Sequence, residues 1–310
     1  MKKILSLVTS HVRQDFQLNY YVTIIFFLTA FLILNYSVDL ETSWIDRDND
    51  NPIRMPLYFS LYGFGYFISC LIVFQYKKIK HVWRSKKFWV FSLVGLSVLS
   101  LDKGFPYLQS IMNSLQQPYD VYAWLFQIAA NMTSFGLVFL PLFVFSKAFD
   151  NQKSRLYGLC TYSNLMPYAY LLLIIAPVIF IASLETSFTD YYPIYKSNMV
   201  AELWNWPSYF PMLIFEIFYG LDFLNVEFLF RGFFVIGMSH VLGKHSIIPM
   251  VVLYCFLHFG KPAGEAISSI FGGYILGVLA FYTRSIWGGI IIHVGVAWMM
   301  EAGAYFSKHF

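Results

Sequence analysis

Long apolar segments separated by short polar ones run along the chain. A membrane-spanning helix needs about 20 predominantly apolar residues. The apolar segments are 20–36, 57–76, 88–101, 121–146, 165–184, 208–242, 246–258, 266–282 and 286–305. The segment 88–101 is short for a crossing. The segment 208–242 is too long for one straight crossing, so we expect it to be tilted, kinked or joined to an interfacial helix. The pattern predicts an all-α fold, a polytopic membrane helical bundle with eight or nine transmembrane helices.

The N-terminal lead-in MKKILSLVTSHVRQDF is amphipathic, and we expect it to lie on the membrane surface. The first apolar segment follows this polar lead-in, and no small-residue cleavage site comes after it. We therefore interpret that segment as a retained helix and not as a signal peptide.

Composition supports a membrane protein and gives no support to a nucleic-acid-binding protein or to a small protein held together by disulfides or zinc. The chain is 58% hydrophobic and only 12% charged, whereas soluble domains carry about 25% charged residues. The net charge of +4 is small and no basic run is long enough to indicate nucleic-acid binding. The three cysteines form no CxxC pair, so neither a disulfide framework nor a zinc knuckle is supported.

Basic residues alternate between the loops and predict an orientation. The loop 77–87 carries six Lys or Arg, and the N-terminus and the loop 147–157 are also basic. The loop 37–56, in contrast, is acidic. Because Lys and Arg concentrate in cytoplasmic loops, we expect the N-terminus to be cytoplasmic.

Charged side chains inside the apolar segments are concentrated near the C-terminus. A charged residue at the centre of a membrane helix costs about 2.5–3.5 kcal/mol on insertion scales, so such residues normally face the bundle interior and have a function. The last 100 residues contain Glu216, Asp222, Glu227, Arg231, His258, His293 and Glu301 in or beside their apolar segments. This asymmetry predicts that the functional site lies in the C-terminal third.

Glu227 and Arg231 are four residues apart, in the order that favours an ion pair on one helix face. The pair alone is as consistent with structure as with function. His258 and His293 change this balance, because a carboxylate with two imidazoles can activate water for peptide hydrolysis. This activation is either direct general-base catalysis or acts through a bound Zn²⁺ on Glu227, His258 and His293. No HExxH motif is present, which excludes the ordinary zincin arrangement.

The segments VEFLFRG, YCFLH and HVGVA, in this order, resemble the motifs of the CPBP family of CAAX-processing and bacteriocin-processing (Abi) intramembrane endopeptidases. The family shows Glu-Glu-x-x-x-Arg, Phe-x-x-x-His and His-x-x-x-Asn/Asp on successive helices. By this resemblance Glu227 is the second glutamate, Arg231 the arginine, and His258 and His293 the two histidines. The resemblance covers about residues 205–305, so we divide the chain into an unmatched N-terminal part, 1–200, and a CPBP-like core, 201–310.

Two positions depart from the family pattern. Val226 stands where the family has the glutamate assigned to water activation, and Ala297 stands where an Asn or Asp helps to form the oxyanion site. Three interpretations stay open: Glu227 acts as the base, Asp222 substitutes from the same helix face one turn earlier, or the site is inactive.

We therefore expect an intramembrane endopeptidase that hydrolyses a peptide bond in a membrane-associated or lipidated peptide, in contact with membrane lipid. The alternatives are an inactive scaffold or binding protein and, third, a proton-coupled transporter. We expect an integral multi-pass protein of the bacterial inner (plasma) membrane.

Overall fold

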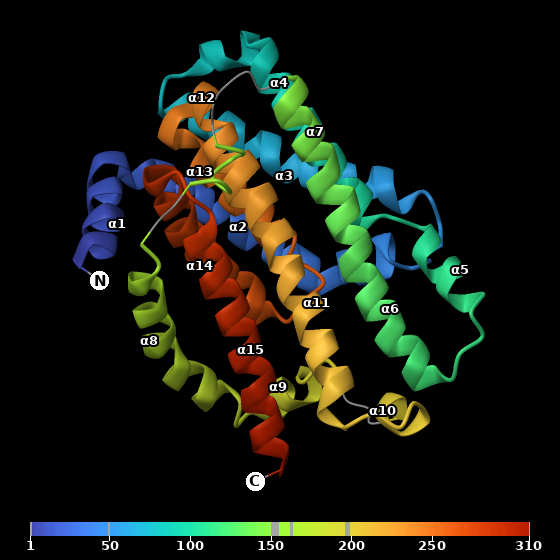
Figure 1. Ribbon diagram of the computed structural model, residues 1–310. Coiled ribbons are helices and arrows are strands. Elements are labelled where there is room, and N and C mark those ends of the chain that lie inside the picture. The colour runs from blue at the N-terminus through green and yellow to red at the C-terminus, as the bar shows by residue number, and fades with distance from the viewer. Residues whose placement is uncertain (1, 49, 150–154, 162–163, 196–198, 310) are drawn as a thin grey trace.

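The computed structural model describes residues 2–48, 50–149, 155–161, 164–195 and 199–309, and within these ranges it is a helical bundle without strands (Figure 1). The α-helices are α1 (Lys2–Asp15), α2 (Leu18–Val38), α3 (Arg54–Tyr76), α4 (Lys86–Lys103), α5 (Tyr107–Asn113), α6 (Tyr119–Ser134), α7 (Leu140–Ala148), α8 (Met166–Ala182), α9 (Thr186–Tyr191), α10 (Met199–Leu203), α11 (Tyr209–Glu227), α12 (Ser239–Leu242), α13 (Ile247–Phe256), α14 (Ala263–Thr283) and α15 (Trp287–His309). The π-helical segments are η1 (Leu40–Ile45), η3 (Phe135–Phe139) and η4 (Phe228–Gly237), and the 3₁₀ segments are η2 (Lys80–Arg84) and η5 (Gly243–Ser246).

The predicted membrane bundle is confirmed, since every apolar segment of the sequence forms a helical element. Among the described residues, 6 helices are long and apolar enough to cross a membrane. The other three apolar segments correspond to α8, to α11 with its continuation, and to α13. Each of these is either too short or not apolar enough to be counted among the six. The chain is therefore a multi-pass membrane protein in which shorter apolar helices complement the full-length spans.

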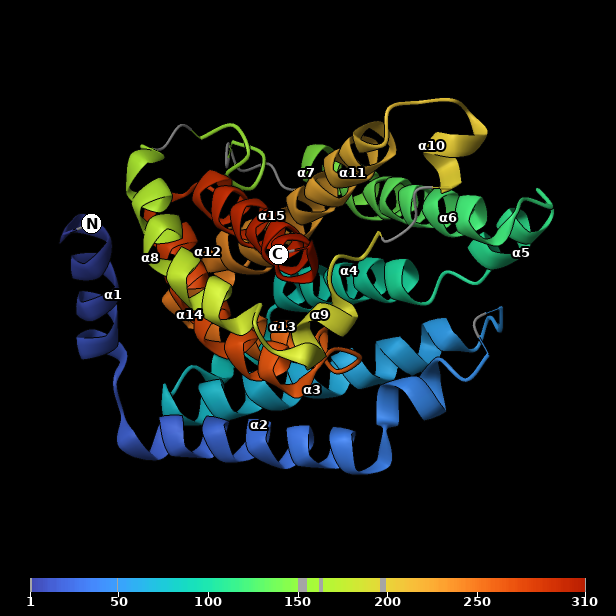
Figure 2. The same ribbon diagram turned by 90° about the horizontal axis from the view of Figure 1, so that it is seen from below.

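The long segment 208–242 changes its helix type along its length, so it is not one straight α-helix. The α-helix α11 ends at Glu227 and continues as the π-helical segment η4, after which α12 and η5 lead into α13. A π-helical turn widens the helix locally and is common at functional sites. Every residue of η4 and of α13 is buried. These two elements form the centre of the bundle, with α2 and α3 on one side and α11 and α15 on the other (Figure 2).

The start of α4, the end of α7 and α12, which lie next to the basic segments of the sequence, are at one end of the bundle (Figure 1). Lys77 Nζ lies 3.1 Å from Asp15 Oδ1 at the end of α1, and Lys244 Nζ donates to the Gln14 carbonyl at 3.4 Å. The indole of Trp287 donates to the Leu159 carbonyl at 2.7 Å. Lys153, which contributes to the predicted basic loop, lies outside the described residues. The common end agrees with the alternation of loop charges, while the side of the membrane stays a prediction.

The N-terminal helix α1 docks on the bundle, where His11 Nδ1 lies 3.2 Å from the Tyr282 hydroxyl of α14. Burial lowers the pKa of His11 where the ring meets α14. The same end holds His245, whose pKa burial also lowers.

At the opposite end, α2 and η1 hold the turn that follows α13. Asn35 Nδ2 donates to the Phe259 carbonyl at 2.9 Å, and the Tyr36 hydroxyl donates to the Lys261 carbonyl at 2.7 Å. The buried Glu41 carboxylate lies against Gly260 and accepts from the Tyr58 hydroxyl at 3.3 Å. Burial raises the pKa of Glu41 to about 7. The first helices of the chain thus position a turn that contains His258.

We predict that the stability of the fold falls as the pH rises from 5 to 8, because Glu41 must ionise in a buried place. The pKa in the folded state exceeds the ordinary value of 4.5. This contribution is therefore complete at low pH and is lost as the pH passes through about 7. In detergent, Glu41→Gln should flatten the profile of melting temperature against pH. The exposed Glu185→Gln is the matched control, and an unchanged Glu41→Gln profile would contradict the assignment.

Candidate active site

Glu227 is the centre of a buried charged cluster at the junction of α11 and η4. Arg231 Nη1 lies 3.0 Å from Glu227 Oε1, and both side chains are fully buried. His293 of α15 places Nδ1 2.7 Å from the same oxygen, with 17% of its side chain exposed. The structure therefore brings Glu227, Arg231 and His293 together. Because both partners approach one oxygen, the carboxylate holds the imidazole and the guanidinium in place.

Tyr254 of α13 connects this cluster to the second histidine. Its hydroxyl lies 2.9 Å from His293 Nε2, and its backbone carbonyl lies 2.8 Å from His258 Nδ1. The guanidinium of Arg231 lies over the Tyr254 ring, 4.3 Å from its centroid, a cation–π contact. Sequence reasoning did not include Tyr254 among the site residues, since it stands only where the family motif has phenylalanine. Its four-residue spacing to His258 is the signal that could have revealed the link.

These contacts assign the proton positions on the two imidazoles. The Glu227 carboxylate favours a proton on Nδ1 of His293, which leaves Nε2 to accept from the Tyr254 hydroxyl. The Tyr254 carbonyl accepts the Nδ1 proton of His258, which leaves Nε2 of His258 as the acceptor nitrogen. The His293 ring is therefore oriented by Glu227 of α11 and Tyr254 of α13, and the His258 ring by the Tyr254 carbonyl.

Two glycines allow this close packing. A Cβ atom at Gly289 of α15 would overlap the Glu227 carboxylate, and one at Gly273 of α14 would lie 3.2 Å from the Tyr254 ring. Small residues such as glycine let neighbouring helices approach closely. The structure shows what they approach, namely the buried carboxylate and the tyrosine that contacts both histidines.

Asp222 does not contact Glu227 or the histidines. It lines a small neighbouring cavity together with Val226, and Asn225 Nδ2 contacts its carboxylate at 3.4 Å. Of the other buried acids, Glu301 accepts from the backbone N–H of Ile194 at 3.0 and 3.1 Å, far along α15. The candidate residues thus divide into a charged histidine cluster and a separate cavity at Val226.

The residues do not fit a zinc site. Among the described residues, no three His, Cys, Asp or Glu side chains are grouped to hold a metal ion. The shared oxygen of Glu227 is occupied by Arg231 and His293, and His258 uses Nδ1 on a carbonyl. A guanidinium beside the carboxylate also opposes the binding of a divalent cation, because the two positive charges repel each other.

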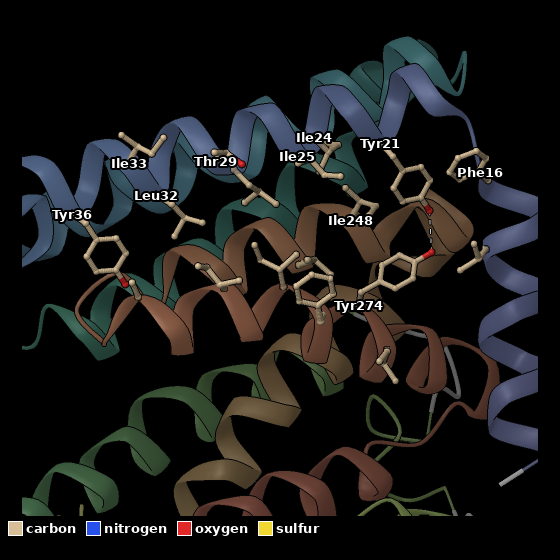
Figure 3. Close-up of a pocket in the computed structure, with 18 of the residues that line it drawn as sticks. Phe16, Tyr21, Ile24, Ile25, Thr29, Leu32, Ile33, Tyr36, Ile248 and Tyr274 are labelled. Atoms are coloured by element: carbon tan, nitrogen blue, oxygen red, sulfur yellow. Dashed lines mark hydrogen bonds between the residues drawn. The ribbon is translucent and has the colours of Figure 1, made fainter. Parts of the chain in front are cut away.

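A long apolar groove lies between α2 and α14 over α13 (Figure 3). Its volume is about 910 Å³, and its lining is almost entirely aliphatic and aromatic. The hydroxyls of Tyr21 and Tyr274 meet across one end at 2.9 Å. At the other end Tyr36 contacts Lys261, three residues after His258. The groove therefore leads from one end of the bundle to the turn that holds His258.

Comparison with known families identifies the C-terminal part of the chain. Residues 210–299 match the family model described as type II CAAX prenyl endopeptidase Rce1-like. This segment is an Rce1-like domain of the CPBP family. The match confirms the resemblance drawn from the motifs, and the Rce1-like domain contains Asp222, Glu227, Arg231, His258 and His293. No curated protein and no solved structure matches the chain.

We predict that Gly289→Ala disrupts the centre of the Rce1-like domain, because the added methyl group would overlap the Glu227 carboxylate. Displacing one member of a buried ion pair costs about 3–5 kcal/mol. The variant should therefore melt well below the wild type in detergent. Gly272→Ala is the matched control, since a Cβ there meets nothing within 4 Å. Equal melting temperatures for the two variants would show that the carboxylate is not held against α15.

Proposed function

We propose that the chain is an intramembrane endopeptidase that hydrolyses a peptide bond in a membrane-associated or lipidated peptide. The observation that carries the proposal is the assembly of Glu227, His293, Tyr254 and His258 across α11, α13 and α15. The Rce1-like domain supports the protease class. The geometry supports the division of roles among the residues.

In the proposed reaction, His258 is the general base. Its Nδ1 proton is held by the Tyr254 carbonyl, so Nε2 is the nitrogen that takes a proton from water. The water oxygen attacks the peptide carbonyl carbon, and the carbonyl oxygen becomes an oxyanion. When the C–N bond breaks, the imidazolium of His258 returns the proton to the leaving nitrogen.

Glu227 is not the base in this scheme. It is fully buried, and its Oε1 atom faces both Arg231 and His293. Its proposed role is to orient His293 and balance the charge of Arg231. The Tyr254 hydroxyl lies 2.9 Å from His293 Nε2. In the proposed reaction it turns its single proton away from that nitrogen and donates it to the oxyanion, where Ala297 has no amide to offer.

The apolar groove supports a substrate with a lipid chain. An alkyl or isoprenoid chain has no polar groups to satisfy, and the groove wall offers almost none. A chain in the groove would bring a peptide attached near Tyr36 to the turn that contains His258. The proposed substrate is therefore a lipidated peptide that enters from the bilayer.

The second candidate function is a membrane binding protein without catalysis. The observation in its favour is Val226, which puts an apolar side chain where the family has its water-activating glutamate. In that case the groove still binds a lipidated partner, but the peptide remains intact.

We predict that His258→Asn lowers kcat for cleavage of a lipidated reporter peptide by about 10²-fold or more, because a positioned acid–base group contributes about 10²–10⁴. His293→Asn should also lower kcat, because it removes the imidazole that contacts the Tyr254 hydroxyl. Purified protein in liposomes is assayed by mass spectrometry of the products. His81→Asn, at an exposed position in η2, is the control. A wild type that binds the reporter without cutting it would favour the second candidate.

We predict that Tyr254→Phe lowers kcat by about 10²-fold with little change in KM, because it deletes only the hydroxyl proposed to stabilise the oxyanion. The ring and its contact with Arg231 remain. Ala297→Asn in the same chain should restore part of the rate by supplying the amide donor. Full activity of Tyr254→Phe would remove the hydroxyl from the mechanism.

A further inference from the structure

A small polar cavity lies where α4, α6 and α11 meet, beside the histidine cluster. Asp102 and Lys103 of α4, Ser134 of α6, and Asp222 and Asn225 of α11 are its polar lining. Val226 and Leu257 also line it, and Leu257 immediately precedes His258. None of Glu227, His258 or His293 is part of the lining. The cavity is therefore a distinct place next to the site, formed partly by residues outside the Rce1-like domain.

The cavity has the size of one water molecule. The space open to the centre of a water-sized sphere is about 20 Å³, and a cavity needs about 10–15 Å³ by this measure to hold a water. Val226 is one of the residues that line the space, so a longer side chain at this position would reduce it. A water also needs two to four polar partners, which the aspartates, the amide and the hydroxyl provide.

One buried group in the lining lacks a partner. Asn225 is 2% exposed, and its Oδ1 atom has no hydrogen-bond partner among the described residues. An unsatisfied buried acceptor costs about 1–3 kcal/mol. Its Nδ2 atom contacts Asp222 at 3.4 Å, so the amide is held with its oxygen free to accept. This unpaired oxygen is an observation independent of the acidic residues.

The polar lining is dominated by acceptors. Two carboxylates and an amide oxygen accept hydrogen bonds, and the Ser134 hydroxyl is itself engaged with Asp102. Such a lining needs a small molecule that donates two hydrogen bonds and fits the space, which is water. Lys103 offsets one of the two carboxylate charges.

We propose that this cavity binds one water molecule, which donates one hydrogen bond to Asn225 Oδ1 and one to the carboxylate of Asp102 or Asp222, and that these side chains are positioning residues that supply the hydrolytic site with water. The second part rests on the proposed function. The water occupies the space left by Val226, so the carboxylates on α4 and α11 compensate for the glutamate absent at that position. Asp102 belongs to the N-terminal helices, which gives those helices a part in the reaction.

The sign of a stability change tests the bound water without any assay of activity. Val226→Ile adds one methyl group to the cavity. Filling a dry cavity raises stability, whereas displacing a bound water leaves Asn225 and the aspartates unsatisfied. We expect the variant to melt about 2–4 °C below the wild type. Val94→Ile, beside a cavity with only apolar lining, is the matched control, and its melting temperature should not fall. A higher melting temperature for Val226→Ile than for the wild type would overturn the proposal.

Substitution of the carboxylates tests the role in hydrolysis. Asp222→Asn and Asp102→Asn keep the shape of the side chains, and each should lower kcat about 10-fold or more with little change in KM. Asp48→Asn, in an exposed loop, is the control. If Val226→Ile falls in stability but the wild type cleaves nothing, the water site stands and the proposed function fails. If the wild type cleaves and both variants retain full kcat, the supply role fails.

Discussion

The buried ion pair of Glu227 and Arg231 is the interaction around which the rest of the structure is arranged. Removing two charges from water costs several kcal/mol for each ion, and only close and well-satisfied contacts offset this cost. The pair is fully buried at 3.0 Å. His293 adds a second contact to the carboxylate, and the Tyr254 ring covers the guanidinium. Removing any one of these contacts leaves a charge with too few partners inside the membrane.

The pair also explains the local shape of the helix that carries it. The change from α-helix to π-helix begins immediately after Glu227, and α15 approaches closely through Gly289. A widened helix and a residue without a side chain give the carboxylate room for two partners. His293 and Tyr254 connect the pair to His258. Any other arrangement of these buried charges would be costly.

The N-terminal helices complete the Rce1-like domain. Asn35 and Tyr36 hold the turn after α13 by its carbonyls, α2 forms one wall of the apolar groove, and α4 places Asp102 beside Val226. Residues on both sides of position 200 share one hydrophobic core. The unmatched part of the chain therefore contributes to the position of His258 and to the surroundings of the site.

The membrane bundle, the irregular segment 208–242 and the concentration of charge in the C-terminal third could all be predicted from the sequence. These features follow from the high cost of placing polar groups in hydrocarbon, because this cost shapes the composition of each membrane segment separately. The sequence also indicated the Glu227–Arg231 pair, because four-residue spacing places side chains on one helix face. Three features could be seen only once the helices were placed in space: Tyr254 contacts both histidines, Asp222 and Asp102 line a separate cavity, and a groove lies between α2 and α14. Those contacts join helices that are far apart in the chain. Their geometry depends on how the helices pack, and a local sequence pattern does not contain that information.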